Sequence, residues 1–81
     1  MEKKIKAFAY LGEKLQHEVQ VDLPLQVSKA IILDKLQKQF PQFKQEIDEC
    51  SVAINQGFAG EEIYSVTEID EIALIPPVSG G

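Results

Sequence analysis

The sequence contains one cysteine, no tryptophan and no apolar run long enough to cross a membrane. A single cysteine cannot form an intramolecular disulfide, so we expect the chain to work in a reducing compartment. The start of the chain, Met1-Glu2-Lys3-Lys4, is charged and leads into no extended apolar segment, which argues against a signal peptide. Together these absences predict a cytoplasmic location.

Basic residues are also scarce. The chain has 8 lysine and arginine residues against 13 aspartate and glutamate residues, which gives a net charge of -5 at pH 7. Nucleic acids and anionic membranes are bound by basic surfaces, so we expect neither as a partner. A protein partner with a basic docking face is favoured instead.

The sequence has few residues suited to metal, cofactor or side-chain chemistry. His17 is the only histidine, and a metal site needs more ligands than one. There is no glycine-rich phosphate loop and no dinucleotide fingerprint, so we expect this chain to bind no metal and no cofactor. Cys50 follows two carboxylates that raise a thiol pKa, and it is interpreted as a passive, buried residue. The acidic pairs Asp48-Glu49 and Glu61-Glu62 are interpreted as solvated surface.

The patterns that are present predict one α+β domain. The chain has 81 residues, of which 44% are hydrophobic and 26% charged, as in a small globular domain. Apolar and alternating segments predict strands at residues 5–10, 17–23, 51–54 and 72–75, and a weaker one at 62–66. Turns are expected at 11–14, around Gly12, and at 55–57. Residues 43–50 are expected to form a short helical turn or an irregular lead-in.

One helix is predicted after the second strand. Ser28 is a good N-cap, because its hydroxyl can accept a hydrogen bond from a first-turn amide. Pro41 ends the helix, because the residue before a proline avoids the helical region. The apolar residues between them are spaced three or four apart on one face: Ile32, Leu33, Leu36 and Phe40.

The order of these elements predicts the architecture. Two strands, a helix and further strands indicate a mixed sheet with one main helix packed on one face, which is the β-grasp, or ubiquitin-like, fold. We expect residues 1–76 to form this domain and residues 77–81 to form an extended C-terminal tail.

The end of the sequence, Pro76-Pro77-Val78-Ser79-Gly80-Gly81, carries the pattern most indicative of function. Two prolines favour a stiff, extended exit, and two glycines without Cβ atoms fit a narrow channel. From Pro77 to Gly81 the tail spans roughly 16–18 Å, at about 3.3–3.6 Å per residue. Glycine-rich chain ends are often only frayed termini. Here an apolar strand and two prolines come just before them, which favours a functional tail whose carboxylate reacts.

Residues 72–81, Ile-Ala-Leu-Ile-Pro-Pro-Val-Ser-Gly-Gly, resemble the C-terminus of the small, sulfur-carrying subunit of molybdopterin synthase. The resemblance extends over the chain, through Phe8-Ala9-Tyr10-Leu11, through Val52-Ala53-Ile54-Asn55-Gln56 and through Asp70-Glu71-Ile72. Two positions depart from the family pattern: Gly12 replaces the usual arginine after the first strand, and Ile69 replaces a glycine before the last one. Because isoleucine disfavours positive φ, the turn at Ile69 is expected to differ in shape.

The resemblance implies a mechanism. The carboxylate of Gly81, behind Gly80, would be adenylated by an enzyme related to ubiquitin-activating enzymes, which binds the ATP, and then converted to a thiocarboxylate. The tail would enter the large subunit of molybdopterin synthase, in a heterotetramer of two small and two large subunits, and donate sulfur to molybdopterin. This chain would be the non-catalytic, sulfur-donating subunit, and no side chain in it is assigned a catalytic role.

The last strand also predicts a docking surface. By alternation, Ile72 and Leu74 should face the helix, which leaves Ile75 on the open face of the sheet near Phe8. Phe58 could join them or be part of the core. The resemblance places the family's partner interface on this open face. The residues expected to bind partners are Phe8, Phe58, Ile75, Pro76, Pro77, Val78 and Ser79.

Three other functions share parts of this pattern. A thiamin-type sulfur carrier has the same fold and the same Gly-Gly end, but it tends to be shorter and usually lacks the Pro-Pro. A ubiquitin-like modifier joined to lysines through Gly81 uses the same activation chemistry. A plain interaction module would carry the two glycines incidentally.

Overall fold

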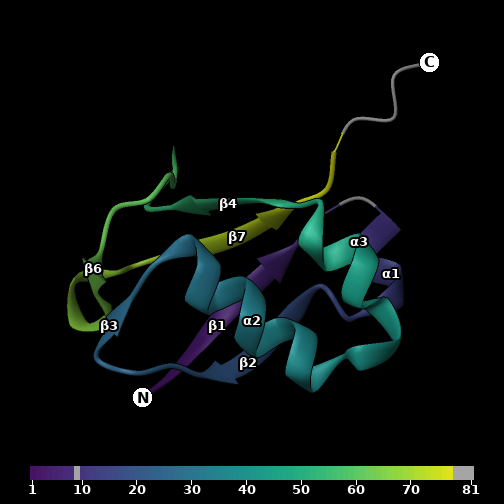
Figure 1. Cartoon of the computed structure of the whole chain (residues 1–81), viewed down its shortest axis with the longest axis horizontal. Coiled ribbons are helices and arrows are strands. Elements are labelled where there is room, and N and C mark those ends of the chain that lie inside the picture. Colours follow the sequence, from purple (N-terminus) through teal and green to yellow (C-terminus); the bar gives the residue numbers. More distant parts are fainter. Residues whose placement is uncertain (9, 78–81) are drawn as a thin grey trace.

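The structure is a computed structural model that describes residues 1–8 and 10–77. Its main sheet has five strands in the order β2-β1-β7-β4-β5 (Figure 1). Strand β1 pairs antiparallel with β2 and parallel with β7, and β4 pairs antiparallel with both β7 and β5. The strands are Glu2–Ala7 (β1), Glu18–Asp22 (β2), Ser51–Ile54 (β4), Gly57–Phe58 (β5) and Ile72–Ile75 (β7).

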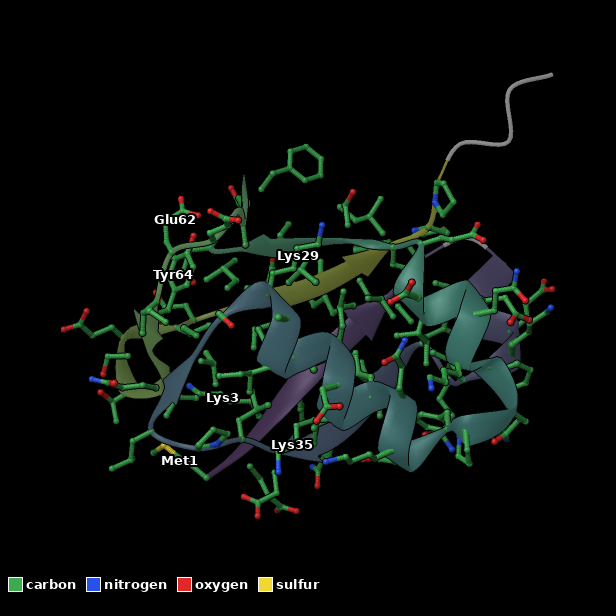
Figure 2. The ribbon with its side chains drawn as sticks, viewed as in Figure 1. Met1, Lys3, Lys29, Lys35, Glu62 and Tyr64 are labelled. Atoms are coloured by element: carbon green, nitrogen blue, oxygen red, sulfur yellow. The ribbon has the colours of Figure 1, made fainter. Side chains whose placement is uncertain are left out.

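A second, two-stranded sheet lies at one end of the molecule. It pairs β3 (Gln26–Val27) with β6 (Tyr64–Ser65) in antiparallel register. Figure 2 places Tyr64 and Glu62 at this end, opposite the end where β7 finishes. The weak strand expected at residues 62–66 is therefore real but only two residues long.

The helical segments account for the rest of the regular structure. They are α1 (Tyr10–Lys14), α2 (Lys29–Gln39), η1 (Pro41–Phe43), α3 (Lys44–Asp48) and η2 (Val66–Glu68), where η marks a 3-10 helix. Among the described residues, no helix has both the length and the apolar character needed to cross a bilayer.

Helix α2 forms as its sequence predicts. The Ser28 hydroxyl accepts a hydrogen bond from the backbone N–H of Ile31 at 3.3 Å, which satisfies one of the free amides at the helix start. Three of the four predicted apolar residues are buried, namely Ile32, Leu33 and Leu36. Phe40 caps the other end by donating its N–H to the carbonyl of Leu36 at 2.9 Å, and Pro41 then starts η1.

The core lies between α2 and one face of the sheet. In β7, Ile72 and Leu74 are almost fully buried, and they pair with Ile54 and Val52 of β4 on the same face. The prediction that Ile72 and Leu74 face the helix is confirmed. One main helix packed across a mixed sheet is the predicted β-grasp arrangement.

The region after β1 differs from the prediction. Strand β1 ends at Ala7, and residues 10–14 form α1 where the sequence predicted the end of a strand and a turn. Gly12 sits inside this helix without a positive φ. A Cβ atom there would collide with the imidazole of His17 and would lie 3.0 Å from the carbonyl oxygen of Ala7. Close packing therefore explains why a glycine occupies position 12. The residue with a positive φ in this region is Gln16, whose φ is 131°.

The turn before β7 accommodates Ile69 without strain. Its φ is −90° and its ψ is 121°, an extended conformation open to any residue, and its side chain is buried in the core. Lys3 donates a hydrogen bond from Nζ to the Ile69 carbonyl oxygen at 2.7 Å. The missing glycine therefore has no conformational cost here.

Candidate functional site

The chain leaves the domain at the end of β7. Pro76, directly after the strand, is buried, and Pro77 is exposed. The predicted tail residues Val78, Ser79, Gly80 and Gly81 lie outside the described residues. The described chain thus ends in a proline held against the domain, followed by one that projects from it.

Three segments meet at this exit. Ala7 of β1 lies beside Leu74, and Ser51 of β4 lies beside Ile75. The pairing continues one residue past β1, because Phe8 donates its N–H to the Leu74 carbonyl at 3.3 Å. Figure 1 shows α1 and α3 at the same end of the sheet. The exit is therefore fixed on both sides by neighbouring strands.

The predicted apolar residues lie on the open face of the sheet. Phe58 is 72% exposed and Phe8 is 48% exposed, and Ile75 is half-buried. None of the three belongs to the cluster of buried residues that forms the core. The geometric prediction that Ile75 and Phe8 share the open face is confirmed, and Phe58 is exposed rather than part of the core. Their role in binding a partner stays a prediction.

Two alanines lie between these larger side chains, and the sequence analysis did not predict their pairing. Ala53 of β4 is paired with Ala73 of β7 and with Phe58 of β5. Both alanines are outside the core cluster, so they lie on the open face. Strand alternation places Ala73 on this face, but the pairing with Ala53 follows only from the register of the two strands.

Charged residues border the apolar part of the open face. Lys6, beside Ala73 in the sheet, donates from Nζ to a carboxylate oxygen of Glu71 at 3.0 Å. Lys4 precedes it by two residues on the same face and is exposed. This face therefore carries both signs of charge, although the chain as a whole is acidic.

Asn55 fixes the approach to β7. Its Oδ1 accepts hydrogen bonds from the backbone N–H groups of Asp70 and Glu71, at 2.7 and 3.0 Å. Its Nδ2 donates to the Glu68 carbonyl at 3.3 Å. Asn55 and Gln56 both have positive φ, 51° and 71°, so they form the turn between β4 and β5. One side chain thus holds this turn against the segment that leads into the last strand.

The structure places Cys50 in the core and the two acidic pairs on the surface. Cys50 is buried, and burial, with a smaller contribution from Glu49, raises the pKa of its thiol to about 11. Its Sγ donates to the carbonyl of Glu46 at 3.1 Å. Both acidic pairs, Asp48-Glu49 and Glu61-Glu62, are exposed. Within the described part of the chain, no three acidic, histidine or cysteine side chains gather as a metal site would require.

A hollow of about 420 Å³ lies on the helix side of the sheet. It is lined by residues from the start of α2, the end of α3 and the loop before β6: Ser28, Lys29, Ala30, Leu33, Asp48, Gly60 and Glu61. None of these is among the predicted site residues. The exit of the tail and the open face therefore remain the candidate site.

Comparison with known proteins agrees with this architecture. A crystal structure of SAMP1 from Haloferax volcanii superposes with a TM-score of 0.78 over 100% of both chains, at 29% sequence identity. A protein from Dictyostelium discoideum named molybdopterin synthase sulfur carrier subunit is 35% identical over 81 residues, which is 96% of this chain and 94% of the relative. The sequence pattern of the ThiS family matches residues 5–81, nearly the whole chain. The chain therefore belongs to the ThiS family.

Proposed function

We propose that this protein is a sulfur carrier that is adenylated and thiocarboxylated at Gly81 and donates sulfur as the small subunit of molybdopterin synthase. The observation that carries the proposal is the relative of that name, which is similar along nearly its whole length. The family match extends to Gly81, so the resemblance includes the Gly-Gly end. The exit at Pro77, beside an exposed apolar face, supports a tail that is delivered to a docked partner.

The chemistry takes place at the Gly81 carboxylate. A carboxylate is a poor electrophile, so the activating enzyme first transfers AMP to it from ATP and releases pyrophosphate. A sulfur nucleophile of the hydrosulfide type then attacks the carbonyl carbon. A C–S bond forms, the C–O bond to AMP breaks, and AMP leaves. On delivery the C–S bond breaks, the sulfur passes to the acceptor, and a water oxygen forms the new C–O bond that restores the carboxylate.

The domain supplies position rather than catalysis in this scheme. Pro76 is buried and Pro77 exposed, so the tail starts from a fixed point. Phe8, Ile75 and Phe58 offer an apolar surface to the large subunit, and aromatic residues are frequent anchors in protein interfaces. ATP is bound by the activating enzyme, which is a separate protein. The substrate is bound by the large subunit, with which this chain forms the proposed heterotetramer.

Intact mass measurement tests the proposal directly. The protein is incubated with ATP, a sulfur donor and the adenylating enzyme of the same organism. We expect a mass gain that corresponds to one oxygen replaced by sulfur, mapped to Gly81. A matched control carries one alanine after Gly81, and we expect no gain for it. The adenylating enzyme is first shown to be active by loading another carrier. If the mass of the unmodified chain then stays unchanged, the proposal is refuted.

Two alternative functions are separated by what happens next. The large subunit of molybdopterin synthase should take the sulfur from the loaded protein and convert its precursor, whereas a thiamin-type carrier should fail in this assay. A ubiquitin-like modifier should form conjugates with lysines in cells, which are detected as Gly81 joined to a lysine side chain. The length of the chain and Pro76-Pro77 favour the molybdopterin branch.

A further inference from the structure

Three segments that are far apart in the sequence line the hollow of about 420 Å³ on the helix side of the sheet. They are the start of α2, the end of α3 and the loop that follows β5. The volume lies within the range of about 300–1,000 Å³ that is typical of ligand pockets. The hollow is distinct from the predicted docking surface, because Phe8, Phe58 and Ile75 are not among its lining residues.

Helix α2 gives the hollow an apolar wall. Ala30 and Leu33 both line it, and they are three residues apart and therefore on one face of the helix. Leu33 is 8% exposed and belongs to the buried core, so this wall is anchored in the domain. The hollow therefore offers an apolar surface along which a hydrocarbon chain can lie.

Two carboxylates that line the hollow have unused hydrogen-bonding capacity. An ionised carboxylate has about four sites that accept hydrogen bonds. Asp48 accepts one long hydrogen bond, of 3.5 Å, from Nε2 of Gln37. Within the described part of the chain, the side chain of Glu61 has no hydrogen bond and no ion pair. Both residues are exposed, so a partner can reach their free oxygens.

Negative charge exceeds positive charge around the hollow. Glu62 adjoins it, because its Oε1 accepts a hydrogen bond from the N–H of Gly60, a lining residue, at 2.7 Å. Backbone hydrogen bonds from its own N–H and from Gly60 lower the pKa of Glu62, so it is charged at neutral pH. The opposing charges are Lys29 and the amino end of α2, which carries about half a positive charge. The three carboxylates outweigh them, so the hollow favours a cation over an anion.

Arginine is the side chain that fits this combination of an apolar wall and free carboxylates. Its planar guanidinium has five N–H donors and can bind two carboxylates, whereas the ammonium of lysine is a compact point charge. Its hydrocarbon stem can lie on apolar surface while the charged head remains near water. The stem would contact Ala30 and Leu33, and the head would pair with Asp48 and Glu61.

We propose that this hollow is a second docking site, which accepts an arginine side chain of a protein partner. The proposal goes beyond the proposed function and does not depend on it, because neither the tail nor the open face takes part. The hollow lies on the helix side of the sheet, so it remains accessible while another protein covers the open face.

NMR titration of the full-length, ¹⁵N-labelled protein with the capped peptide acetyl-Ala-Arg-Ala-amide tests this proposal. We expect saturable changes in the amide signals of Ser28, Ala30, Gly60 and Glu61, all with the same dissociation constant. The control peptide carries citrulline in place of arginine, which keeps the shape of the side chain and removes its charge. We expect the control peptide to bind at least fivefold more weakly.

Two double variants with the same change in net charge separate a specific site from general attraction. Asp48→Asn with Glu61→Gln removes the proposed contacts, and we expect the affinity for the arginine peptide to fall about fivefold, since two exposed ion pairs contribute roughly 1 kcal/mol together. Glu2→Gln with Glu18→Gln removes two exposed carboxylates from β1 and β2, outside the hollow. We expect this control to bind the peptide within twofold of the unmodified protein.

Three results would overturn the docking site. Equal weakening by the two double variants, or signal changes spread over all acidic surfaces, would show that net charge alone attracts the peptide. Equal binding of the citrulline peptide would show that the guanidinium charge is not recognised. The absence of saturable changes at millimolar peptide would show that the hollow does not accept arginine. Each of these results would leave the proposed function intact, because the experiment involves no sulfur transfer.

Discussion

Asn55 illustrates how one exposed side chain can hold two distant segments together. Its amide makes three hydrogen bonds to backbone groups of residues 68–71, and its φ of 51° is one that asparagine tolerates better than most residues. These contacts explain why a polar residue, Asn55, follows the apolar strand β4. It closes the β4–β5 turn and orients the chain as it enters β7.

Replacement of Asn55 by alanine should reveal this role. We expect Asn55→Ala to lower the free energy of unfolding by about 2 kcal/mol, because three hydrogen bonds are lost and positive φ becomes less favourable. Urea denaturation measures the change. Asn55→Gly keeps the backbone freedom and removes only the hydrogen bonds, so its loss should be smaller. Equal stability of all three proteins would contradict the assignment.

Cys50 should make stability depend on pH in the alkaline range. Its pKa is about 11 in the folded protein against 9.0 for the free thiol, so the folded state holds the proton more tightly. This contribution is fully present below pH 9 and is lost as pH rises toward 11. Two pKa units correspond to about 3 kcal/mol in full, at about 1.4 kcal/mol per unit, and about 2 kcal/mol of this should be lost by pH 11.

The measurement compares urea denaturation of the natural protein and Cys50→Ala from pH 7 to pH 11. The alanine variant is expected to lose less stability over this range. Because the lysines titrate in both proteins, the difference between the two profiles reports the thiol. Parallel pH profiles would mean that the thiol ionises as easily in the folded state as in the unfolded one.

At the scale of elements, the end of α1 stores backbone strain. Gln16 has a φ of 131°, in a region that residues other than glycine rarely adopt. We expect Gln16→Gly to stabilise the protein by about 1 kcal/mol by removing this strain. The melting temperature should rise by roughly 4–8 °C for a domain of this size. Gln16→Ala keeps the Cβ atom and serves as the control, which should show no such rise.

Strand β7 should respond differently on its two faces. Leu74 is buried under α2, and Leu74→Ala should cost about 2–5 kcal/mol because it leaves a cavity. Ile75 is on the open face, and Ile75→Ala should cost about 1 kcal/mol or less. Chemical denaturation gives both values. Similar costs at the two positions would show that the open face is packed more tightly than its exposure indicates.

The elements that the sequence predicted well are those with a strong local pattern. Strand β7 was predicted with its observed bounds, and α2 is marked by its cap, its apolar spacing and Pro41. Strand β3 and helix α1 were missed because they are two and five residues long and depend on tertiary contacts. In the site, alternation located Ile75 and Phe8. The pairing of Ala53 with Ala73 was missed because it depends on which strands pair and in what register, and no local pattern contains that information.

At the scale of the whole molecule, the proposed function gives separate tasks to the domain and to the expected tail. Pro77 lies at their junction and is exposed, so its replacement should spare the fold. We expect Pro77→Gly to leave the melting temperature unchanged and to lower kcat/KM for sulfur transfer about fivefold. A freer tail loses roughly 1 kcal/mol more conformational entropy when it enters the partner. Pro24→Gly, at an exposed position after β2, is the control. An unchanged transfer rate for Pro77→Gly would show that stiffness at the exit is not needed.

The parallel pairing of β1 with β7 also affects how the protein is made. Strand β1 leaves the ribosome well before its central partner β7, because Ile5 pairs with Ile72, which lies 72 − 5 = 67 residues further along the chain. Contacts so distant in sequence form late, so the main sheet closes only after β7 has been synthesised. Lys6 and Ala73, from opposite ends of the sequence, meet on the open face only at that moment. Under the proposed function, a product terminated before β7 would lack the proposed docking face as well as the Gly81 carboxylate, and it could not compete with finished carriers for their partner.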